Sequence, residues 1–144
     1  MSSEFGGLPK AEFGYPGPLR DRLVAAILAG AKTATTSLLG DYEREGAPLP
    51  EPGARSVVVD SADRPVAVIE VTRVRIAPLK DVDPAHVTAE GEGDATMAEW
   101  RAAHERFWRS GARAVDDNTM VVLERFRLVA RVDETGLVNR NRDM

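Results

Sequence analysis

Apolar residues recur at helical spacing in two long stretches of the chain. The first stretch predicts a helix over residues 19–29, because its apolar side chains lie on one face: Leu19, Leu23, Val24, Ile27 and Leu28. Pro18 suits the first turn of this helix, and Gly30 suits the position just past its end. The second helix begins at a capping box formed by Thr96 and Glu99, ends at Gly111, and carries on one side Trp100, Ala103, Phe107 and Trp108.

Three further stretches are rich in β-branched residues and predict strands, at residues 56–60, 65–76 and 120–132. The polar turn over residues 61–64 joins the first two into an antiparallel hairpin. Apolar residues occupy both faces in the middle of the second strand, which is typical of a curled sheet or a small barrel covered by helices. The predicted fold class is therefore α+β, with mainly antiparallel strands.

Two short helical segments and two polar segments complete the pattern. Asp83 caps a brief helix that continues through Glu90, and a helical turn starts at Leu38 and ends near Gly46. The two polar segments are a loop at 47–53, which contains three prolines, and a glycine-rich loop at 91–94. The second loop lacks the regular ligand alternation of a calcium loop, so it is predicted to be a solvated turn.

Composition places the chain among ordinary globular proteins. Its 144 residues suffice for one hydrophobic core. We expect a flexible arm over residues 1–12, a folded domain over 13–132 and a polar tail over 133–144. No stretch is apolar enough to span a membrane, and the first residues lack the features of a secretory signal, so we expect a cytoplasmic protein without membrane contact. The oligomeric state is left open.

The absence of cysteine narrows the possible chemistry. Thiol catalysis and disulfides are excluded, and His86 and His104 alone are too few for a dedicated zinc site, so we expect no cofactor and no metal. The net charge of −4 argues against nucleic-acid binding over the whole surface. A local basic patch remains compatible with it.

The stretch from Gly30 to Ser37 places Lys32 among hydroxyl side chains directly after the first predicted helix. If the chain coils or kinks after Gly30, the Lys32 ammonium and the Thr35 hydroxyl come within hydrogen-bond reach. A buried lysine loses the hydration of its charged form, its pKa falls, and it can act as a base toward a nearby hydroxyl. The alternative is a solvated lysine in a turn rich in serine and threonine.

Two glutamates interrupt apolar strand faces. Glu70 shares its face with several valines, and Glu124 interrupts the last strand in the same way. Because an isolated buried carboxylate is costly, Glu70 is expected to have a cationic partner, a raised pKa or access to a cleft. The alternative is that its face is the solvated one. His104 is either an acid or base or an ordinary surface histidine.

Arginines form one basic stripe on this acidic chain. Arg125, Arg127 and Arg131 alternate along the last predicted strand, and Arg73 and Arg75 lie on the neighbouring one. Such a stripe can meet RNA phosphates. The alternative is the wet face of a sheet whose arginines pair with nearby carboxylates.

Taken together, these segments resemble the ASCH domain family over roughly residues 13–131. The resemblance rests on segments that occur in the family's order: Gly30-x-Lys32, Ser37-Leu38-Leu39, Val57-Val58-Val59-Asp60, Val68-Ile69-Glu70-Val71-Thr72, Glu90-Gly91-Glu92-Gly93-Asp94 before Trp100-Arg101, and Glu124-Arg125-Phe126. ASCH domains are similar in fold to PUA domains. The resemblance implies a small β-barrel flanked by helices, with a cleft between them, and an RNA or modified nucleoside as partner.

Members that resemble this chain differ in activity: some hydrolyse the acetyl amide of N4-acetylcytidine, some are described as ribonucleases, and others only bind RNA. In the amidase type, the resemblance implies a catalytic set that falls on Lys32, Thr35 and Glu70. Lys32 would accept the proton of Thr35, whose oxygen attacks the carbonyl, while Glu70 orients Lys32 or passes the proton to the leaving amine. Backbone amides near Gly30 would stabilise the oxyanion.

The chain departs from the wider family pattern at Ser37, where an arginine is usual, so Arg73 or Arg125 would have to replace it. The residues expected to contact substrate or RNA are Gly30, Thr33, Ser37, Arg73, Arg125 and Arg127. The function expected from the resemblance is an RNA- or nucleoside-directed hydrolase, either an amidohydrolase or a ribonuclease that uses His104 with Glu70. The alternative is an RNA-binding module without catalysis.

Overall fold

The computed structural model describes residues 7–94, 96–132 and 138–140. Within this part, Lys10 and Ala11 of the expected arm form a strand, and three residues of the expected tail form another. Residues 1–6 of the arm and the rest of the tail lie outside the described residues, so the domain boundaries stay predictions.

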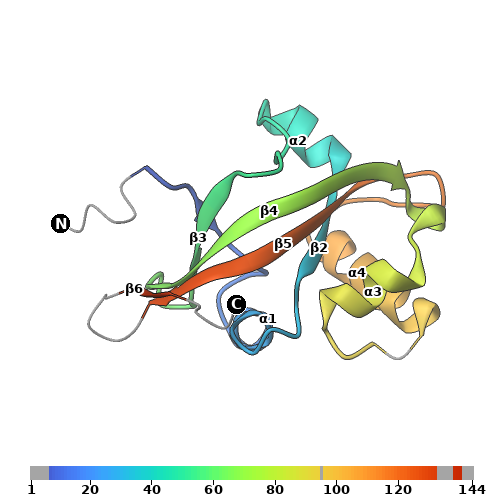
Figure 1. Ribbon diagram of the computed structural model, residues 1–144. Helices are drawn as coiled ribbons and strands as arrows, with labels where there is room; N and C mark the ends of the chain where they lie inside the picture. The colour runs from blue at the N-terminus through green and yellow to red at the C-terminus, as the bar shows by residue number, and fades with distance from the viewer. Residues whose placement is uncertain (1–6, 95, 133–137, 141–144) are drawn as a thin grey trace.

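The strands form one mixed sheet (Figure 1). Its order is β1-β3-β4-β5-β2 with β6 paired to β5, where the strands are β1 (Lys10–Ala11), β2 (Ala34–Leu38), β3 (Arg55–Val59), β4 (Pro65–Pro78), β5 (Met120–Val132) and β6 (Val138–Arg140). The β1–β3 pair is parallel and the others are antiparallel. The α+β class and the β3–β4 hairpin are confirmed. Among the described strands β1 and β2 end the sheet without pairing to each other, so closure into a barrel stays a prediction.

Helices flank this sheet on the sides where its apolar residues point. They are α1 (Pro18–Leu28), α2 (Leu39–Glu45), α3 (Pro84–Glu90) and α4 (Met97–Ser110), with a 3₁₀ turn η1 (Leu79–Asp81). As expected, Pro18 opens α1, and the Thr96 side chain caps α4 by accepting from the Glu99 N–H. None of the helices in the described segments is long and apolar enough to cross a membrane.

The strand β2 corrects the sequence analysis, which considered a coil, a kink or a turn there and predicted no strand. Ala34–Leu38 pairs antiparallel with β5, so Thr35 lies opposite Glu124 and Ser37 opposite Val122. The segment shows no apolar alternation because the hydroxyl residues Thr35, Thr36 and Ser37 occupy its middle. Its strand conformation therefore depends on pairing with β5, which hydrophobic periodicity does not detect.

Two hydrophobic clusters pack the sheet and position its helices. One joins α1 to the sheet and includes Ile27, Ile69 and Phe126, and the other joins α3 and α4 to it and includes Trp100, Trp108 and Leu123. The register of β4 against β5 shifts at two irregularities, one of them between Val71 and Arg73. Such bulges bend strands. The sheet is apolar on both faces, in different regions, as the sequence predicted.

The loop after α3 approaches the junction between α1 and β2 very closely. Gly91 has a φ of +62°, and a Cβ at this position would lie 2.0 Å from the Ala31 carbonyl oxygen. The Thr33 amide also donates to the Ala89 carbonyl oxygen at 2.6 Å. The glycine is therefore needed both for its backbone conformation and for space.

We expect Gly91→Ala to destabilise the protein by more than about 3 kcal/mol, because the backbone at Ala31 must move as well as Gly91 itself. Gly93→Ala is the matched control. Gly93 also has a positive φ, +88°, but its Cβ would meet open space, so the expected cost is about 1–2 kcal/mol. Urea unfolding of both variants measures the difference, and equal costs would contradict the close packing of this loop.

Candidate functional site

A cleft of about 1080 Å³ lies beside β2, between the segment of residues 9–16, α2 and α4. Thr35 and Ser37 of β2 line it together with Lys32, Glu92 and Glu124. Aromatic side chains from three directions also line it: Phe13, Tyr15, Tyr42, Phe107 and Trp108. The cleft therefore combines apolar walls with a small number of ionisable groups, as ligand sites commonly do.

Lys32 is the central cation of this cleft, and its side chain has no exposed surface. Its Nζ donates to the Glu92 Oε2 at 2.7 Å, to the Ala34 carbonyl oxygen at 2.8 Å and, at 3.4 Å, to the Glu90 carbonyl oxygen. Nζ also lies 5.9 Å from the centre of the Phe13 ring. Three acceptors, one of them a carboxylate, match the three N–H bonds of an ammonium group. The resting site thus holds a charged lysine.

A second buried group, Glu90, collects partners from three elements. His86 Nε2 lies 3.2 Å and His104 Nε2 3.0 Å from its two carboxylate oxygens. The Thr36 hydroxyl donates to the same carboxylate and accepts from His86 Nε2 at 2.8 Å. Glu90 and His86 are each fully buried. This network ties α3 and α4 to β2 directly behind Lys32.

His104 is held in its charged form by this arrangement. Its Nδ1 lies 2.9 Å from the Trp100 carbonyl oxygen, so that ring nitrogen carries a proton, and its Nε2 faces the Glu90 carboxylate. Burial alone lowers the pKa of His104, but the hydrogen bond to Glu90 and the charges of Glu90 and Glu92 outweigh burial and raise the pKa. The imidazole also stacks on Trp100, with ring centres 4.2 Å apart.

The pKa values of the two glutamates on either side of Gly91, Glu90 and Glu92, are shifted in opposite directions. Burial opposes the ionisation of Glu90, but hydrogen bonds from His104 and His86 and the charges of His104 and Lys32 keep its pKa well below the ordinary range. Burial and the neighbouring charge of Glu90 raise the pKa of Glu92, whereas the charge of Lys32 lowers it. The net effect is a raised pKa. Glu90 is therefore a fixed anion, whereas Glu92 is the carboxyl group that can take up a proton.

Glu124 is another carboxyl group that lines the cleft. Burial raises its pKa to about 6, although the positive charge of Lys32 acts in the opposite direction. It forms no hydrogen bond or ion pair with the residues that the structure describes. Thr35 lies opposite it on β2, and residues opposite each other in a sheet point to the same face. The Thr35 hydroxyl and the Glu124 carboxyl are therefore neighbours.

Some residues expected at the site lie elsewhere. Thr33 donates from its hydroxyl to the Ala89 carbonyl oxygen at 3.2 Å, and it is not part of the cleft lining. Gly30 also lies outside the lining. The amides of residues 30–33 donate to backbone carbonyl oxygens of Ile27, Ala26 and Ala89. They are therefore not available for an oxyanion, contrary to the expectation for this segment.

The structure does not bring Glu70 into the cleft. Ile69 and Val71 line the cleft, so Glu70 between them points to the opposite face. There it accepts from Arg55 Nε at 2.9 Å and Arg127 at 3.3 Å, and these two arginines hold its pKa below the ordinary value. The cationic partner expected for Glu70 is present, and of its two predicted environments the solvent-facing one is found.

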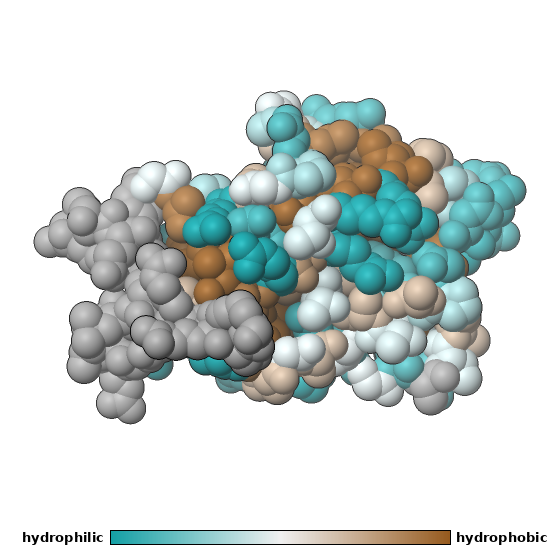
Figure 2. Space-filling view, in the orientation of Figure 1, coloured by the Kyte–Doolittle hydropathy of each residue, from teal (hydrophilic) through white to brown (hydrophobic). Residues whose placement is uncertain are grey.

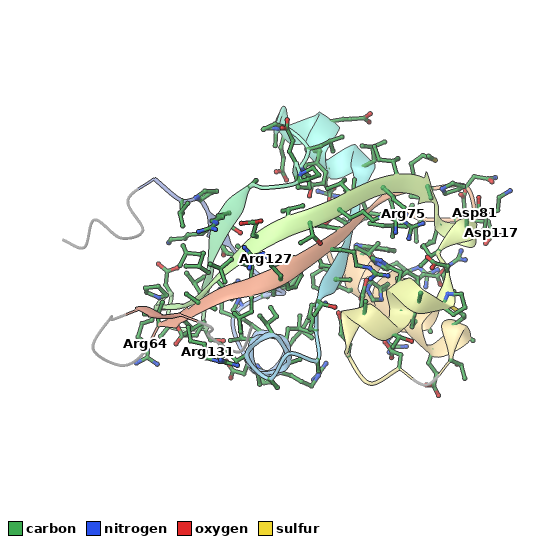
Figure 3. All side chains as sticks on the ribbon, viewed as in Figure 1. Arg64, Arg75, Asp81, Asp117, Arg127 and Arg131 are labelled. Atoms are coloured by element: carbon green, nitrogen blue, oxygen red, sulfur yellow. The ribbon has the colours of Figure 1, made fainter. Side chains whose placement is uncertain are left out.

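Three of the expected arginines, Arg73, Arg125 and Arg127, share that outer face. Arg73 lies opposite Arg125 across β4 and β5, and Arg127 follows on β5. Figure 3 shows Arg127 over the sheet and Arg131 near α1, where Arg131 donates to the Leu28 carbonyl oxygen at 2.7 Å, and Figure 2 shows hydrophilic residues gathered over the middle of the outer face. Neither Arg73 nor Arg125 therefore takes the place of the family arginine at Ser37, because Ser37 lines the cleft on the other side.

One group of side chains has the composition of a metal site. Single ligand atoms of Glu90, Glu92 and His104 lie within 4.8 Å of one another. The Lys32 ammonium already contacts Glu92, and the His104 nitrogen that would bind a metal faces Glu90. Lys32 and His104 thus already balance the charges of the two glutamates, so we interpret the group as an ion-pair network and not as a metal site.

Sequence reasoning missed Glu92, Glu90 and His86, and it predicted that the loop at 91–94 is a solvated turn. That prediction is wrong for Glu92, whose side chain is only 20% exposed and pairs with Lys32. The available signal was Gly91 between two glutamates directly after a short helix. A glycine there permits the close backbone approach that carries Glu92 to Lys32.

Comparison with known proteins places this chain in a family. The ASCH domain model matches residues 11–130. Protein EF3133 from Enterococcus faecalis V583 is 28% identical with a TM-score of 0.80, covering 88% of this chain and 79% of its own. The ASCH domain from Lactobacillus crispatus JV V101 is 26% identical with a TM-score of 0.73, covering 89% and 86%.

A third solved structure shows the fold alone. The hypothetical protein PH0355 is 15% identical with a TM-score of 0.56, covering 77% of this chain and 94% of its own. The search of curated proteins finds no match.

The raised pKa of Glu124 gives a prediction for stability. Its folded-state pKa of about 6 exceeds the ordinary value of 4.5, so the favourable contribution is complete below pH 4.5 and is lost as the pH rises through 6. Glu124→Gln avoids this loss. We expect the variant to gain about 2 kcal/mol over the wild type at about pH 8 relative to the difference at about pH 4. Urea unfolding at the two pH values checks this, and a pH-independent difference would contradict the burial of this carboxyl.

Proposed function

The chain belongs to the ASCH domain family, and from that premise we propose that its cleft hydrolyses an acyl amide on a modified nucleoside. Lys32, Thr35 and Glu92 are the reactive residues in this proposal. Lys32 and Thr35 keep the roles that the family resemblance implies, and Glu92 takes the role that the resemblance assigned to Glu70.

A single observation supports the proposal most directly: a fully buried lysine contacts a carboxylate in a cleft that Thr35 also lines. The 2.7 Å contact between Lys32 Nζ and Glu92 Oε2 is short enough for a proton to pass between them. Glu70, by contrast, lies on the outer face with Arg55 and Arg127. Glu92 is therefore the better candidate for the acid.

The chemistry begins with that proton. When a substrate displaces water from the cleft, Lys32 passes one proton to Glu92, whose carboxyl favours the neutral form because it is buried. The neutral amine then accepts the hydroxyl proton of Thr35. The Thr35 oxygen attacks the amide carbonyl and forms a tetrahedral intermediate.

The second half of the reaction restores the site. The carbon–nitrogen bond breaks as Glu92 gives its proton to the leaving amine, and the acyl group stays on Thr35 as an ester. Water then hydrolyses the ester with Lys32 and Glu92 moving its protons, which releases the carboxylic acid and regenerates the Thr35 hydroxyl. One water is consumed per amide bond broken.

A second candidate function, RNA binding without catalysis, is favoured by the arginine face. Arg73 and Arg125 stand opposite each other without an ion pair to any described residue, and Arg125 Nε is buried without a hydrogen-bond partner. Like charges opposite each other in a sheet are unfavourable unless an anion lies between them. A phosphate group of RNA would supply that anion.

The hydrolase proposal predicts that the protein deacetylates N4-acetylcytidine. Lys32→Met, Thr35→Val and Glu92→Gln should each reduce turnover by about a hundredfold or more, because each removes a proton-transfer or nucleophilic group. Mass spectrometry of the nucleoside measures this, with mixed-sequence RNA as a parallel substrate. Thr72→Val, an exposed residue on β4 outside the cleft lining, is the matched hydroxyl control and should keep full activity.

Comparing Glu70→Gln with Glu92→Gln shows which of the two carboxylates takes part in the reaction. Full activity in this variant with loss in Glu92→Gln supports Glu92, and the reverse result contradicts its assignment. Lys32-dependent shortening of RNA would indicate a ribonuclease. No turnover of either substrate, with RNA still bound, would replace the hydrolase proposal by the binding module.

The RNA-binding candidate predicts a distinct effect of the outer face. Arg73→Ala and Arg125→Ala should each weaken binding of single-stranded RNA and reduce the slope of log affinity against log salt by about 0.7. Fluorescence anisotropy at several salt concentrations measures this. Arg109→Ala is the control, because Arg109 is an exposed arginine of α4 that pairs with Glu105. An equal effect in the control would indicate nonspecific charge.

A further inference from the structure

The Glu124 carboxyl is a half-buried ionisable group of the cleft that the proposed reaction does not use. It lies on the same face as Thr35, directly across β5 and β2. It forms no hydrogen bond with a described residue, so its carboxyl oxygens are open to a partner in the cleft. A ligand in the cleft is the natural source of the missing hydrogen bonds.

Most of the charged groups near Glu124 are already occupied. Lys32 Nζ has its three acceptors, and both oxygens of Glu90 face histidines. Arg20, which lines the cleft from α1, donates to the Gly14 carbonyl oxygen at 2.8 Å and to Glu12 at 3.2 Å, and its Nε has no partner among the described residues. Glu124 and Thr35 therefore remain as an adjacent pair of groups with free hydrogen-bonding capacity toward a ligand.

The walls near these two groups suit a flat ring. Tyr15 packs against Phe107 with ring centres 5.3 Å apart, yet Tyr15 remains 58% exposed. Phe13 and Trp108 are buried aromatic residues of the same lining. Aromatic side chains of this kind stack on nucleobases, and such a ring would direct its polar edge to the carboxyl groups.

We infer that Glu124 recognises the ligand by pairing its carboxyl group with an amidine-type edge, in which a ring nitrogen that accepts a hydrogen bond stands beside an exocyclic N–H that donates one. The inference rests on the proposed function in placing the substrate in this cleft. Cytosine and adenine carry such an edge, so the class of ligand is an aminated heteroaromatic base.

The match follows from the two oxygens of a neutral carboxyl group. Its O–H donates to the ring nitrogen while its C=O accepts from the exocyclic N–H, which gives two parallel hydrogen bonds. Burial favours the neutral form of Glu124, since it raises the pKa to about 6. The ligand's ring nitrogen stabilises that form further by accepting the proton.

An anionic ligand fits this position poorly. A phosphate placed beside Glu124 would meet the Glu92 carboxylate in the same cleft, while Lys32 is already paired with Glu92. Like charges in a partly buried site repel strongly. The recognised group is therefore the base, and any phosphate of the ligand would have to point toward the mouth of the cleft.

Binding of unreactive nucleosides tests this inference apart from catalysis. Calorimetry at about pH 5.5 should show the full-length protein binding cytidine about tenfold or more tightly than 3-deazacytidine, which lacks the ring acceptor. Glu124→Leu should remove this preference. Glu124→Gln is the matched variant: its amide retains one donor and one acceptor, so the preference should persist.

The outcomes separate the two proposals. Cytidine preference that depends on Glu124, without turnover of N4-acetylcytidine, would leave the recognition role standing and overturn the hydrolase. Turnover with the same KM in the wild type and Glu124→Leu would overturn the recognition role alone. Binding of neither cytidine nor adenosine, or equal affinity for cytidine and 3-deazacytidine, would also overturn it. Thermal unfolding of each variant confirms that the compared proteins are folded.

Discussion

The burial of the Lys32 ammonium is the constraint on which the rest of the site depends. A lysine side chain without exposed surface is costly unless all of its N–H bonds have acceptors. Those acceptors come from β2, through the Ala34 carbonyl, and from the loop after α3, through Glu90 and Glu92. The loop after α3 must therefore pack onto the end of α1. Gly91 makes this possible because it has no Cβ that would collide with the backbone of Ala31.

Charge balance extends this constraint to α4. Glu90 is fully buried and needs cationic partners, which His104 supplies from α4 and Lys32 supplies from the other side. Four groups, Lys32, His104, Glu90 and Glu92, thus neutralise one another within the protein. Such a network holds its members rigidly. Glu124 stands outside this balance: burial raises its pKa to about 6, and it forms no hydrogen bond with a described residue.

The sequence predicts most of the fold and only part of the site. Periodicity locates α1, α4 and the long strands because their apolar residues face a core, and the capping residue Thr96 marks the start of α4 correctly. The strand β2 escapes because its stability comes from pairing with β5. The local pattern of a polar segment does not show with which distant strand, or in which register, it pairs. For the same reason, the local sequence does not show which carboxylate lies at the site.

Glu70 and Glu92 illustrate that limit for the site. Glu70 looks informative in the sequence because it interrupts an apolar strand, but a strand has two faces and Arg55 and Arg127 lie on the outer one. Glu92 looks like part of a polar turn, yet the turn folds back on Lys32 sixty residues earlier in the chain. Only the tertiary contact distinguishes the two carboxylates.

Alternation along β5 also separates the two candidate functions in space. Glu124 faces the cleft, and Arg125 beside it faces the outer side of the sheet with Arg73. A free nucleoside that fills the cleft cannot also reach the arginine face, since the sheet lies between them. A polynucleotide can use both only by passing around the edge strand β2, where α3 and α4 pack. The hydrolase and RNA-binding proposals therefore depend on different faces of the sheet and are physically independent.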